Sequence, residues 1–122
     1  MRKRFIHALL ATVIAVVGVG VAATPASAVA TCPTGNLCMW TGQWENGTKR
    51  IMTLSAGACT NMVGSWDNNI ESFWNASSTR YYAFTSYNCV ITPAFIILEP
   101  GTEYLAMPST FNNTISSIQR AG

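Results

Sequence analysis

The residues best suited to chemistry in this sequence are side-chain oxygens that occur in two copies of one short segment. Trp66-Asp67-Asn68-Asn69-Ile70-Glu71-Ser72 returns about 45 residues later as Phe111-Asn112-Asn113-Thr114-Ile115-Ser116-Ser117. An aromatic residue, two Asx residues, an isoleucine and a serine keep their positions, which indicates one supersecondary unit used twice. Any chemistry at these oxygen-rich segments is therefore expected twice in the folded domain.

Histidine, which much hydrolytic machinery requires, occurs only once, as His7 near the N-terminus. Without histidine elsewhere, the sequence excludes serine or cysteine nucleophiles activated by imidazole, and zinc hydrolysis of the HExxH type. Paired carboxylates, which glycoside hydrolysis uses, stay formally possible. The five candidates all adjoin turn signals and are predicted to be solvated loop residues: Glu45, Asp67, Glu71, Glu99 and Glu103. The sequence thus predicts a protein that binds, not an enzyme.

The N-terminal segment has the features of a secretory signal peptide. Three cations at positions 2–4 precede an apolar run over residues 5–23, and Pro25-Ala26-Ser27-Ala28 forms a small-residue cleavage pattern. We expect cleavage after Ala28, which leaves a single secreted, extracellular domain of residues 29–122. An uncleaved anchor is the alternative, since the apolar run is nearly long enough to span a bilayer.

The part after residue 28 carries few charges. Its four cations, Lys49, Arg50, Arg80 and Arg120, stand against five carboxylates, so the formal charge of +2 for the whole chain becomes −1. Such a domain lacks a basic patch that could neutralise phosphates, and neither nucleic acids nor membranes are expected as partners. We expect a monomer that requires no cofactor.

All four cysteines lie after residue 28, and an even count in a small exported domain predicts two disulfides. Three pairings are possible, and sequence alone does not choose between them. We favour Cys32 with Cys38, which closes a short loop, and Cys59 with Cys89, which ties the first half of the chain to the second. A zinc site is the weaker alternative, because Cys-x5-Cys is an unusual spacing and histidine is missing.

Short strands separated by turns are expected to position these residues. Apolar, aromatic or β-branched runs predict strands at residues 37–40, 49–54, 81–85, 95–98 and 115–119. Asn46-Gly47 and Pro100-Gly101 are turn signals, and the first is typical of a β-hairpin. No segment after residue 28 keeps a helical period over about ten residues. The predicted fold class is all-β, a sandwich or small barrel.

The two repeated segments resemble the signature of the βγ-crystallin fold, a double Greek-key sandwich in which each repeat holds an Asx-Asx-x-x-Ser/Thr-Ser loop. Residues 112–117 match it at every defined position, whereas Glu71 replaces the expected Ser or Thr of the first copy. Trp40-x-x-x-Trp44-x-x-Gly47 is similar to the opening of the first Greek key, with a slightly different spacing. The resemblance implies one disulfide-stapled, βγ-crystallin-like sandwich of two repeats, at about residues 32–75 and 80–120.

In calcium-binding members of that fold, the loops supply oxygen ligands, and the fifth-position Ser or Thr of one loop serves the site of the other. The resemblance therefore implies two candidate sites for Ca²⁺, a hard cation that takes oxygen ligands. The residues that would supply side-chain or backbone oxygens are Asp67, Asn69, Glu71, Thr114 and Ser116. The alternative is that the Asx residues only form turns that hold the chain in shape.

The leader, the Cys-Pro-x-Gly-x-x-Cys segment at residues 32–38, and the later Cys59 and Cys89 resemble a secreted microbial inhibitor family typified by the Streptomyces metalloproteinase inhibitor. The likeness implies inhibition of extracellular, thermolysin-like metalloproteases, which favour a bulky apolar residue just after the cleaved bond. Cys89-Val90-Ile91 offers such a residue beside a tethered cysteine and is the predicted reactive loop. The alternative is that Val90 and Ile91 are ordinary apolar strand residues.

Two other functions stay open at this point. The first is a calcium-binding structural module, built on the two Asx segments. The second is a carbohydrate-binding module, for which exposed tryptophans would form a platform: Trp40, Trp44, Trp66 and Trp74. Most of these tryptophans are expected in the core, because aromatic residues dominate burial in small domains.

Overall fold

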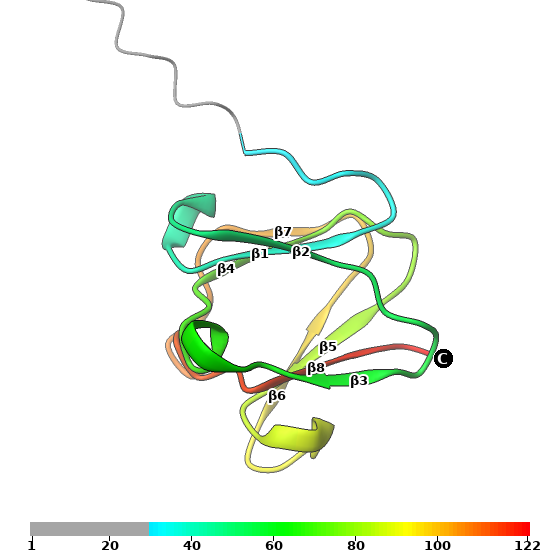
Figure 1. Ribbon diagram of the computed structural model, residues 1–122, viewed down its shortest axis with the longest axis vertical. Coiled ribbons are helices and arrows are strands. Elements are labelled where there is room, and N and C mark those ends of the chain that lie inside the picture. Colours follow the sequence, from blue (N-terminus) through cyan, green and yellow to red (C-terminus); the bar gives the residue numbers. More distant parts are fainter. Residues whose placement is uncertain (1–29) are drawn as a thin grey trace, which may run out of the picture.

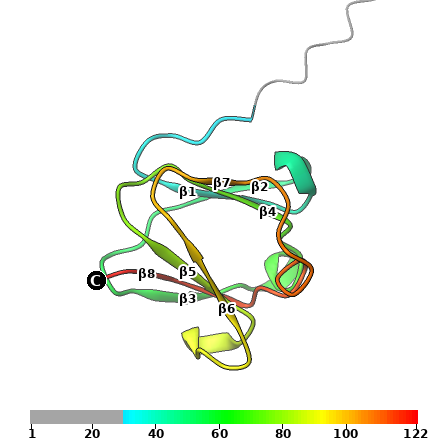
Figure 2. The ribbon, with the colours of Figure 1, turned by 180° about the vertical axis from the view of Figure 1, so that it is seen from behind.

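The computed structural model describes residues 30–122, and the predicted signal peptide lies outside this range. Within it, eight short strands form two four-stranded antiparallel sheets that face each other (Figure 1, Figure 2). Sheet A has the order β2 (Lys49–Met52), β1 (Leu37–Trp40), β4 (Ser72–Asn75), β7 (Glu103–Tyr104). Sheet B has the order β3 (Cys59–Asn61), β8 (Ser117–Arg120), β5 (Tyr81–Phe84), β6 (Phe95–Leu98). Three one-turn 3-10 helices lie in the connections: η1 (Gln43–Glu45), η2 (Gly64–Trp66) and η3 (Tyr87–Cys89).

Each half of the chain gives three strands to one sheet and one strand to the other. The first half supplies β1, β2 and β4 to sheet A and β3 to sheet B, and the second half reverses this arrangement. The register repeats as well, since Trp40 pairs with Lys49 in sheet A as Phe84 pairs with Phe95 in sheet B. This two-fold relation confirms the double Greek-key sandwich that the repeated segments predicted, and it makes each half an internal control for the other.

The core lies between the sheets and is built from side chains that alternate along each strand. Leu37, Met39 and Phe73 face inward from sheet A and are fully buried. The isoleucine of each repeated segment, Ile70 or Ile115, is also fully buried. The repeat is therefore partly a packing signal, because its isoleucine anchors each loop while its polar residues stay at the rim.

The strands predicted at residues 37–40 and 95–98 are confirmed. Three other predicted strands end earlier or start later than expected, and β3, β4 and β7 were missed. The missed strands are only two to four residues long and lack a β-branched run, so their own sequences carry little β signal. They form because longer-range partners offer hydrogen-bonding edges, as β8 does for β3.

The β-hairpin predicted at Asn46-Gly47 is present, because β1 pairs with β2, but its connection is longer than a two-residue turn. Left-handed conformations fall at Trp44 (φ 56°), Glu45 (φ 58°) and Gly47 (φ 82°), whereas Asn46 is extended. The chain folds back on itself, so that the N–H of Gly42 donates to the carbonyl oxygen of Asn46 at 2.9 Å. Glycine is needed at position 47, because a Cβ there would lie 2.6 Å from Oγ1 of a threonine six residues earlier.

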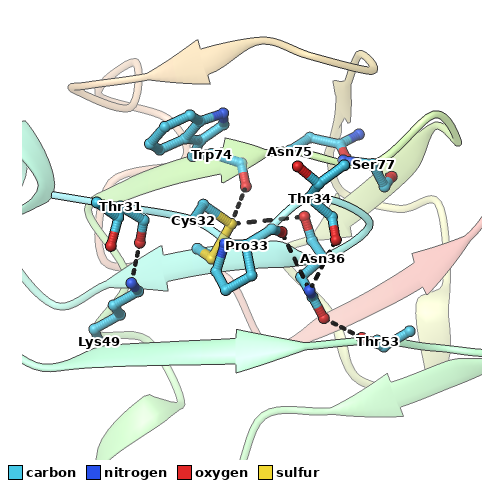
Figure 3. The surroundings of a disulfide bond; sticks show 11 residues. Thr31, Cys32, Pro33, Thr34, Asn36, Lys49, Thr53, Trp74, Asn75 and Ser77 are labelled. Carbon is cyan, nitrogen blue, oxygen red and sulfur yellow. Dashed lines mark hydrogen bonds between the residues drawn. A yellow bond between two sulfur atoms is a disulfide. The ribbon is translucent and has the colours of Figure 1, made fainter.

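Both favoured disulfides, Cys32–Cys38 and Cys59–Cys89, are present, so no cysteine within residues 30–122 is free. The first one fastens residues 30–36 over the outer face of sheet A (Figure 1, Figure 3). Lys49 donates to the carbonyl oxygen of Thr31 on this covering segment, and Cys38 beneath it is fully buried. No helix within residues 30–122 has the length and apolar character needed to cross a membrane.

Candidate functional site

Two folded hairpins occupy equivalent places in the two halves. Hairpin 1 (residues 41–48) joins β1 to β2, and hairpin 2 (residues 85–94) joins β5 to β6. Each contains a 3-10 helix with two consecutive left-handed residues, which are Asn88 (φ 61°) and Cys89 (φ 54°) in hairpin 2. Since hairpin 1 has the same pair at Trp44 and Glu45, this backbone shape belongs to the fold and is not a strain reserved for a binding loop.

The final serine of each repeated segment positions one hairpin. The N–H of Cys89 donates to Oγ of Ser117 at 2.9 Å, and the N–H of Glu45 donates to Oγ of Ser72 at 3.2 Å. The Ser117 hydroxyl in turn donates to the carbonyl oxygen of Ser86 at 2.5 Å, and the Ser72 hydroxyl donates to that of Gly42 at 2.7 Å. Both serines are fully buried. This role was not predicted from the sequence, although the presence of a serine at the end of both repeated segments could have indicated it.

Hairpin 2 differs from hairpin 1 in length and in what it exposes. Thr41 and Thr48 close hairpin 1 by a backbone hydrogen bond, whereas Thr85 and Ala94 close hairpin 2, which is therefore two residues longer. The longer part includes the predicted reactive residues, with side chains 47% exposed at Val90 and 65% exposed at Ile91. Val90 is not an ordinary strand residue, because β6 begins only at Phe95.

Side chains from the first half anchor hairpin 2. Its 3-10 helix is bonded to β3 through the Cys59–Cys89 disulfide. Asn88 also donates its N–H to Oδ1 of Asn61 at 2.7 Å, and Nδ2 of Asn61 donates back to Oδ1 of Asn88 at 3.0 Å. The Tyr87 hydroxyl donates to the Asp67 carboxylate, and this hydrogen bond raises the pKa of Tyr87. In hairpin 1 the residue that corresponds to Asn88 is Trp44, and its N–H donates instead to the backbone carbonyl oxygen of Leu105.

The two Asx loops, residues 67–72 and 112–117, lie side by side between the sheets (Figure 1, Figure 2). The Ser116 hydroxyl is hydrogen-bonded to Oδ1 of Asp67 at 2.8 Å and lies 3.2 Å from Oδ1 of Asn68. Across the two-fold relation, Nδ2 of Asn113 donates to Oε1 of Glu71 at 2.8 Å. The fifth-position side chain of each loop thus contacts the opposite loop.

Asn69 and Thr114 serve their own loops. Nδ2 of Asn69 donates to the carbonyl oxygen of Ser65 at 3.0 Å, and Oγ1 of Thr114 donates to that of Thr110 at 2.9 Å. The side chains that meet between the loops also include Asn68 and Asn113, which were not among the predicted site residues. Residues 30–122 contain no cluster of three or more His, Cys, Asp or Glu residues that could hold a metal ion. A cation here would rely on one carboxylate and several neutral oxygens.

The second Asx loop leaves one oxygen without a partner. Oδ1 of Asn112 is buried and accepts no hydrogen bond from the described residues. Asn112 corresponds to Asp67, which is hydrogen-bonded to Ser116, but a glutamate, Glu71, stands in the place of that serine. A buried acceptor without a donor is unusual in a folded protein.

The tryptophans do not share one exposed face. Trp40 is buried under Lys49, whose Nζ lies 5.6 Å from the ring centre, and Arg50 lies over Trp66 at 5.9 Å. Only Trp44 is largely exposed, at 64%. The platform considered for carbohydrate binding is therefore not formed, and no pocket opens on the described part of the chain.

Glu45 makes stability depend on pH. Burial raises the pKa of its carboxyl, the nearby Glu103 raises it further, and Lys49 opposes the rise. Because the pKa is higher in the folded state, the folded protein binds more protons, and stability falls as the pH rises through the raised pKa. Glu45→Gln should therefore raise Tm by roughly a few degrees at pH 7, with no gain at about pH 3, below the ordinary glutamate pKa. Thermal unfolding at both pH values measures this, and an equal gain at both would contradict it.

Comparison with solved structures defines the class of protein. A structure described under the evolution of the eye-lens βγ-crystallin domain fold has a TM-score of 0.62 at 19% identity, covering 76% of this chain and 92% of its own. A βγ-crystallin domain from Flavobacterium johnsoniae has a TM-score of 0.56 at 14% identity, covering 70% and 93%. The Ca²⁺-bound βγ-crystallin domain of Abundant Perithecial Protein from Neurospora crassa has a TM-score of 0.56 at 14% identity, covering 75% and 92%. At these identities the likeness establishes the βγ-crystallin fold and nothing further.

The sequence itself defines the family. Residues 25–96 match peptidase inhibitor family I36, and the chain belongs to that family. A search of curated proteins gives no match. The fold and the family together agree with the resemblance inferred from the Asx loops and the cysteine spacing.

Proposed function

We propose that the protein is a secreted inhibitor of extracellular, thermolysin-like metalloproteases, and that Cys89-Val90-Ile91 is its reactive loop. Membership of peptidase inhibitor family I36 supports a protease as partner and a binding role in place of catalysis. The choice of loop rests on the contrast between the two hairpins. Hairpin 1 folds without a disulfide or extra residues, whereas hairpin 2 has both and exposes two large aliphatic side chains.

The geometry suits a protease that selects a bulky apolar residue after the cleaved bond. Extended backbone, which a protease cleft can accept, begins at Val90 (φ −77°, ψ 131°), whereas Cys89 is left-handed. The enzyme would therefore bind the side of the loop that follows the Cys89–Val90 bond, with Val90 in the pocket and Ile91 next to it. Anchors on Tyr87, Asn88 and Cys89 hold the loop before binding, so little entropy is lost on association.

The same anchors would limit the damage of a cut. If the Cys89–Val90 bond were hydrolysed, the new C-terminus would stay bonded to β3 through Cys59. The new N-terminus would stay near it, because Ser86 donates to the carbonyl oxygen of Thr92 and Thr85 pairs with Ala94. Fragments held in this way do not diffuse out of the cleft, which favours a long-lived complex over turnover.

Titration of a thermolysin-like metalloprotease with the domain of residues 29–122 tests the proposal. We expect inhibition at a one-to-one ratio, and no inhibition of a serine protease assayed in parallel. Inhibition of the serine protease alone would keep the family and reject the target class. Failure to inhibit any metalloprotease at micromolar concentration would reject the proposed function.

Calcium binding at the Asx loops is a second candidate, and the unpartnered Asn112 oxygen supports it. Glu71, Asn112 and Asn113 would hold one ion, and Asp67, Asn68 and Ser116 the other. One carboxylate per site predicts weak binding, with Kd of about 0.1–1 mM by analogy with extracellular calcium modules. Such binding is compatible with inhibition, since the Asx loops and the reactive loop use different residues.

We expect 10 mM Ca²⁺ to raise Tm by several degrees, because binding at roughly 10–100 times Kd stabilises the folded state by about 1–3 kcal/mol. Glu71→Gln should remove part of the shift, and Ser116→Ala another part. Differential scanning calorimetry in Ca²⁺ or Mg²⁺ measures the effect, with the variants in EDTA as controls. Neither heat of binding nor a thermal shift would mean that the Asx residues only form turns.

A further inference from the structure

Exposed apolar side chains concentrate around hairpin 2. Of the eight large hydrophobic residues that are exposed within residues 30–122, five lie between positions 87 and 97: Tyr87, Val90, Ile91, Phe95 and Ile97. Residues 81–98 contain no charged side chain at all. The apolar surface therefore does not end with the reactive loop, and it continues along β6.

The continuation forms a flat surface on the outer face of sheet B. Phe95 lies opposite Phe84 and Ile97 lies opposite Tyr82 in the β5–β6 register. The ring of Phe95 stacks on that of Phe84 at 5.8 Å between centroids and meets that of Tyr82 edge-on at 6.3 Å. We call Tyr82, Phe95 and Ile97 the outer-face surface. Its strand β6 begins where hairpin 2 ends (Figure 1).

The equivalent face of sheet A is covered in part by the protein itself. Cys38 stands where sheet B has Tyr82, and the segment bonded to it, residues 30–36, lies over that face (Figure 3). Ile51 is the counterpart of Ile97 and is the one exposed large apolar residue of β2. On sheet B, hairpin 2 packs against β3 and β8, whereas Phe95 and Ile97 of β6 stay 40% and 38% exposed.

The β6 edge of this surface is also unpaired and uncharged. The N–H of Thr85 donates to the carbonyl oxygen of Ala94, so the alternation of an antiparallel pair points the backbone groups of Phe95 and Ile97 away from β5. Among these groups, the carbonyl oxygen of Ile97 accepts from the Tyr104 hydroxyl at 3.1 Å. The corresponding edge of sheet A carries Lys49 and Arg50, which protect it from pairing.

We propose that the outer-face surface is a second contact for the same protease that hairpin 2 engages. This inference rests on the proposed function. A protease–inhibitor interface takes about 20–30 residues from each partner, and hairpin 2 spans only residues 85–94. The continuous apolar surface adds contact area on the side that follows the cleaved bond, because the chain continues from Val90 into β6. The matching part of the enzyme is an apolar, uncharged rim beside its substrate cleft.

Ile97→Lys and its counterpart Ile51→Lys test the surface, with the inhibition constant against a thermolysin-like metalloprotease as the readout. Each variant puts a lysine at the same register position of an edge strand, but only one lies beside hairpin 2. We expect Ile97→Lys to raise the inhibition constant about tenfold or more and Ile51→Lys to leave it within about twofold. Equal inhibition by both variants would overturn the second contact and leave the reactive loop standing. A wild-type protein that does not inhibit would overturn both.

Hydrogen–deuterium exchange on the wild-type complex gives an answer even if Ile97→Lys does not fold. The amides of Phe95 and Ile97 should exchange more slowly in the complex than in the free inhibitor, while those of Arg50 and Ile51 should not change. Unchanged exchange at Phe95 and Ile97 would overturn the proposal. The proposal would also be overturned if the wild-type protein forms a dimer and Ile97→Lys dissociates that dimer without changing inhibition. The outer-face surface would then bind a second copy of the chain.

Discussion

Val90→Asp should abolish inhibition of a thermolysin-like metalloprotease without disturbing the fold. The substitution would place an unpaired carboxylate in the apolar pocket of the enzyme, at a cost of several kcal/mol, so we expect the inhibition constant to rise by about 100-fold or more. In the free protein the same carboxylate lies in water, because the Val90 side chain is 47% exposed and lies outside the strands. Its effect on the free energy of unfolding should therefore stay within about 0.5 kcal/mol.

Val63→Asp is the matched control, since Val63 is 67% exposed on a different loop, just before η2. Inhibition constants and circular dichroism of both variants separate a lost contact from a lost fold. If Val90→Asp still inhibits fully, the reactive loop is elsewhere. Hairpin 1 is then the place to look, because Trp44 is 64% exposed at its tip, and Trp44→Ala would decide.

Replacing Cys59 and Cys89 together by serine should convert the inhibitor into a substrate. The disulfide spans a sequence separation of 30 residues, and its loss should lower the free energy of unfolding by about 3–4 kcal/mol in the chain-entropy model. The larger consequence is functional, because Cys89 loses its bond to β3 and the cut ends of hairpin 2 are free to separate. We expect inhibition that fades over minutes to hours as the loop is cleaved.

The double replacement of Cys32 and Cys38 by serine is the control for stability alone. Its disulfide spans a separation of only 6 residues and should contribute about 2–3 kcal/mol. The segment that it holds, residues 30–36, lies over sheet A, away from hairpin 2 (Figure 1). Urea unfolding and the time course of inhibition, with gel analysis of cleavage, distinguish the two variants. Lasting inhibition by the Cys59/Cys89 variant would show that the disulfide is not what retains the cleaved loop.

Much of the fold could be predicted because the chain uses one unit twice. The repeated Asx segments predicted two equivalent loops. The isoleucine keeps its position in both copies because Ile70 and Ile115 are buried. The strand at residues 95–98 was predictable because its apolar residues are consecutive in the sequence. The disulfides were among three allowed pairings, and the preferred pairing is the observed one.

The features that could not be predicted from the sequence are those that depend on residues far away along the chain. Asn46-Gly47 is a strong local turn signal, yet hydrogen bonds from Trp44 and Glu45 to distant parts of the chain select a longer folded hairpin. β3 has almost no β signal of its own and forms on the edge of β8, more than fifty residues away in the sequence. Long-range pairing of this kind overrides local preference, because it satisfies backbone groups that would otherwise be buried without partners.

The candidate site, like the fold, was predictable in part from the sequence. The sequence by itself determined that a bulky aliphatic pair follows a cysteine, that two oxygen-rich segments exist, and that residues 29–122 contain no histidine. Only the tertiary structure decided that Val90 and Ile91 are exposed on an anchored hairpin, that Ser117 holds Cys89, and that Phe95 and Ile97 are exposed on β6. Residue type specifies what a side chain can do, whereas exposure and partners follow from which distant strands pack against it.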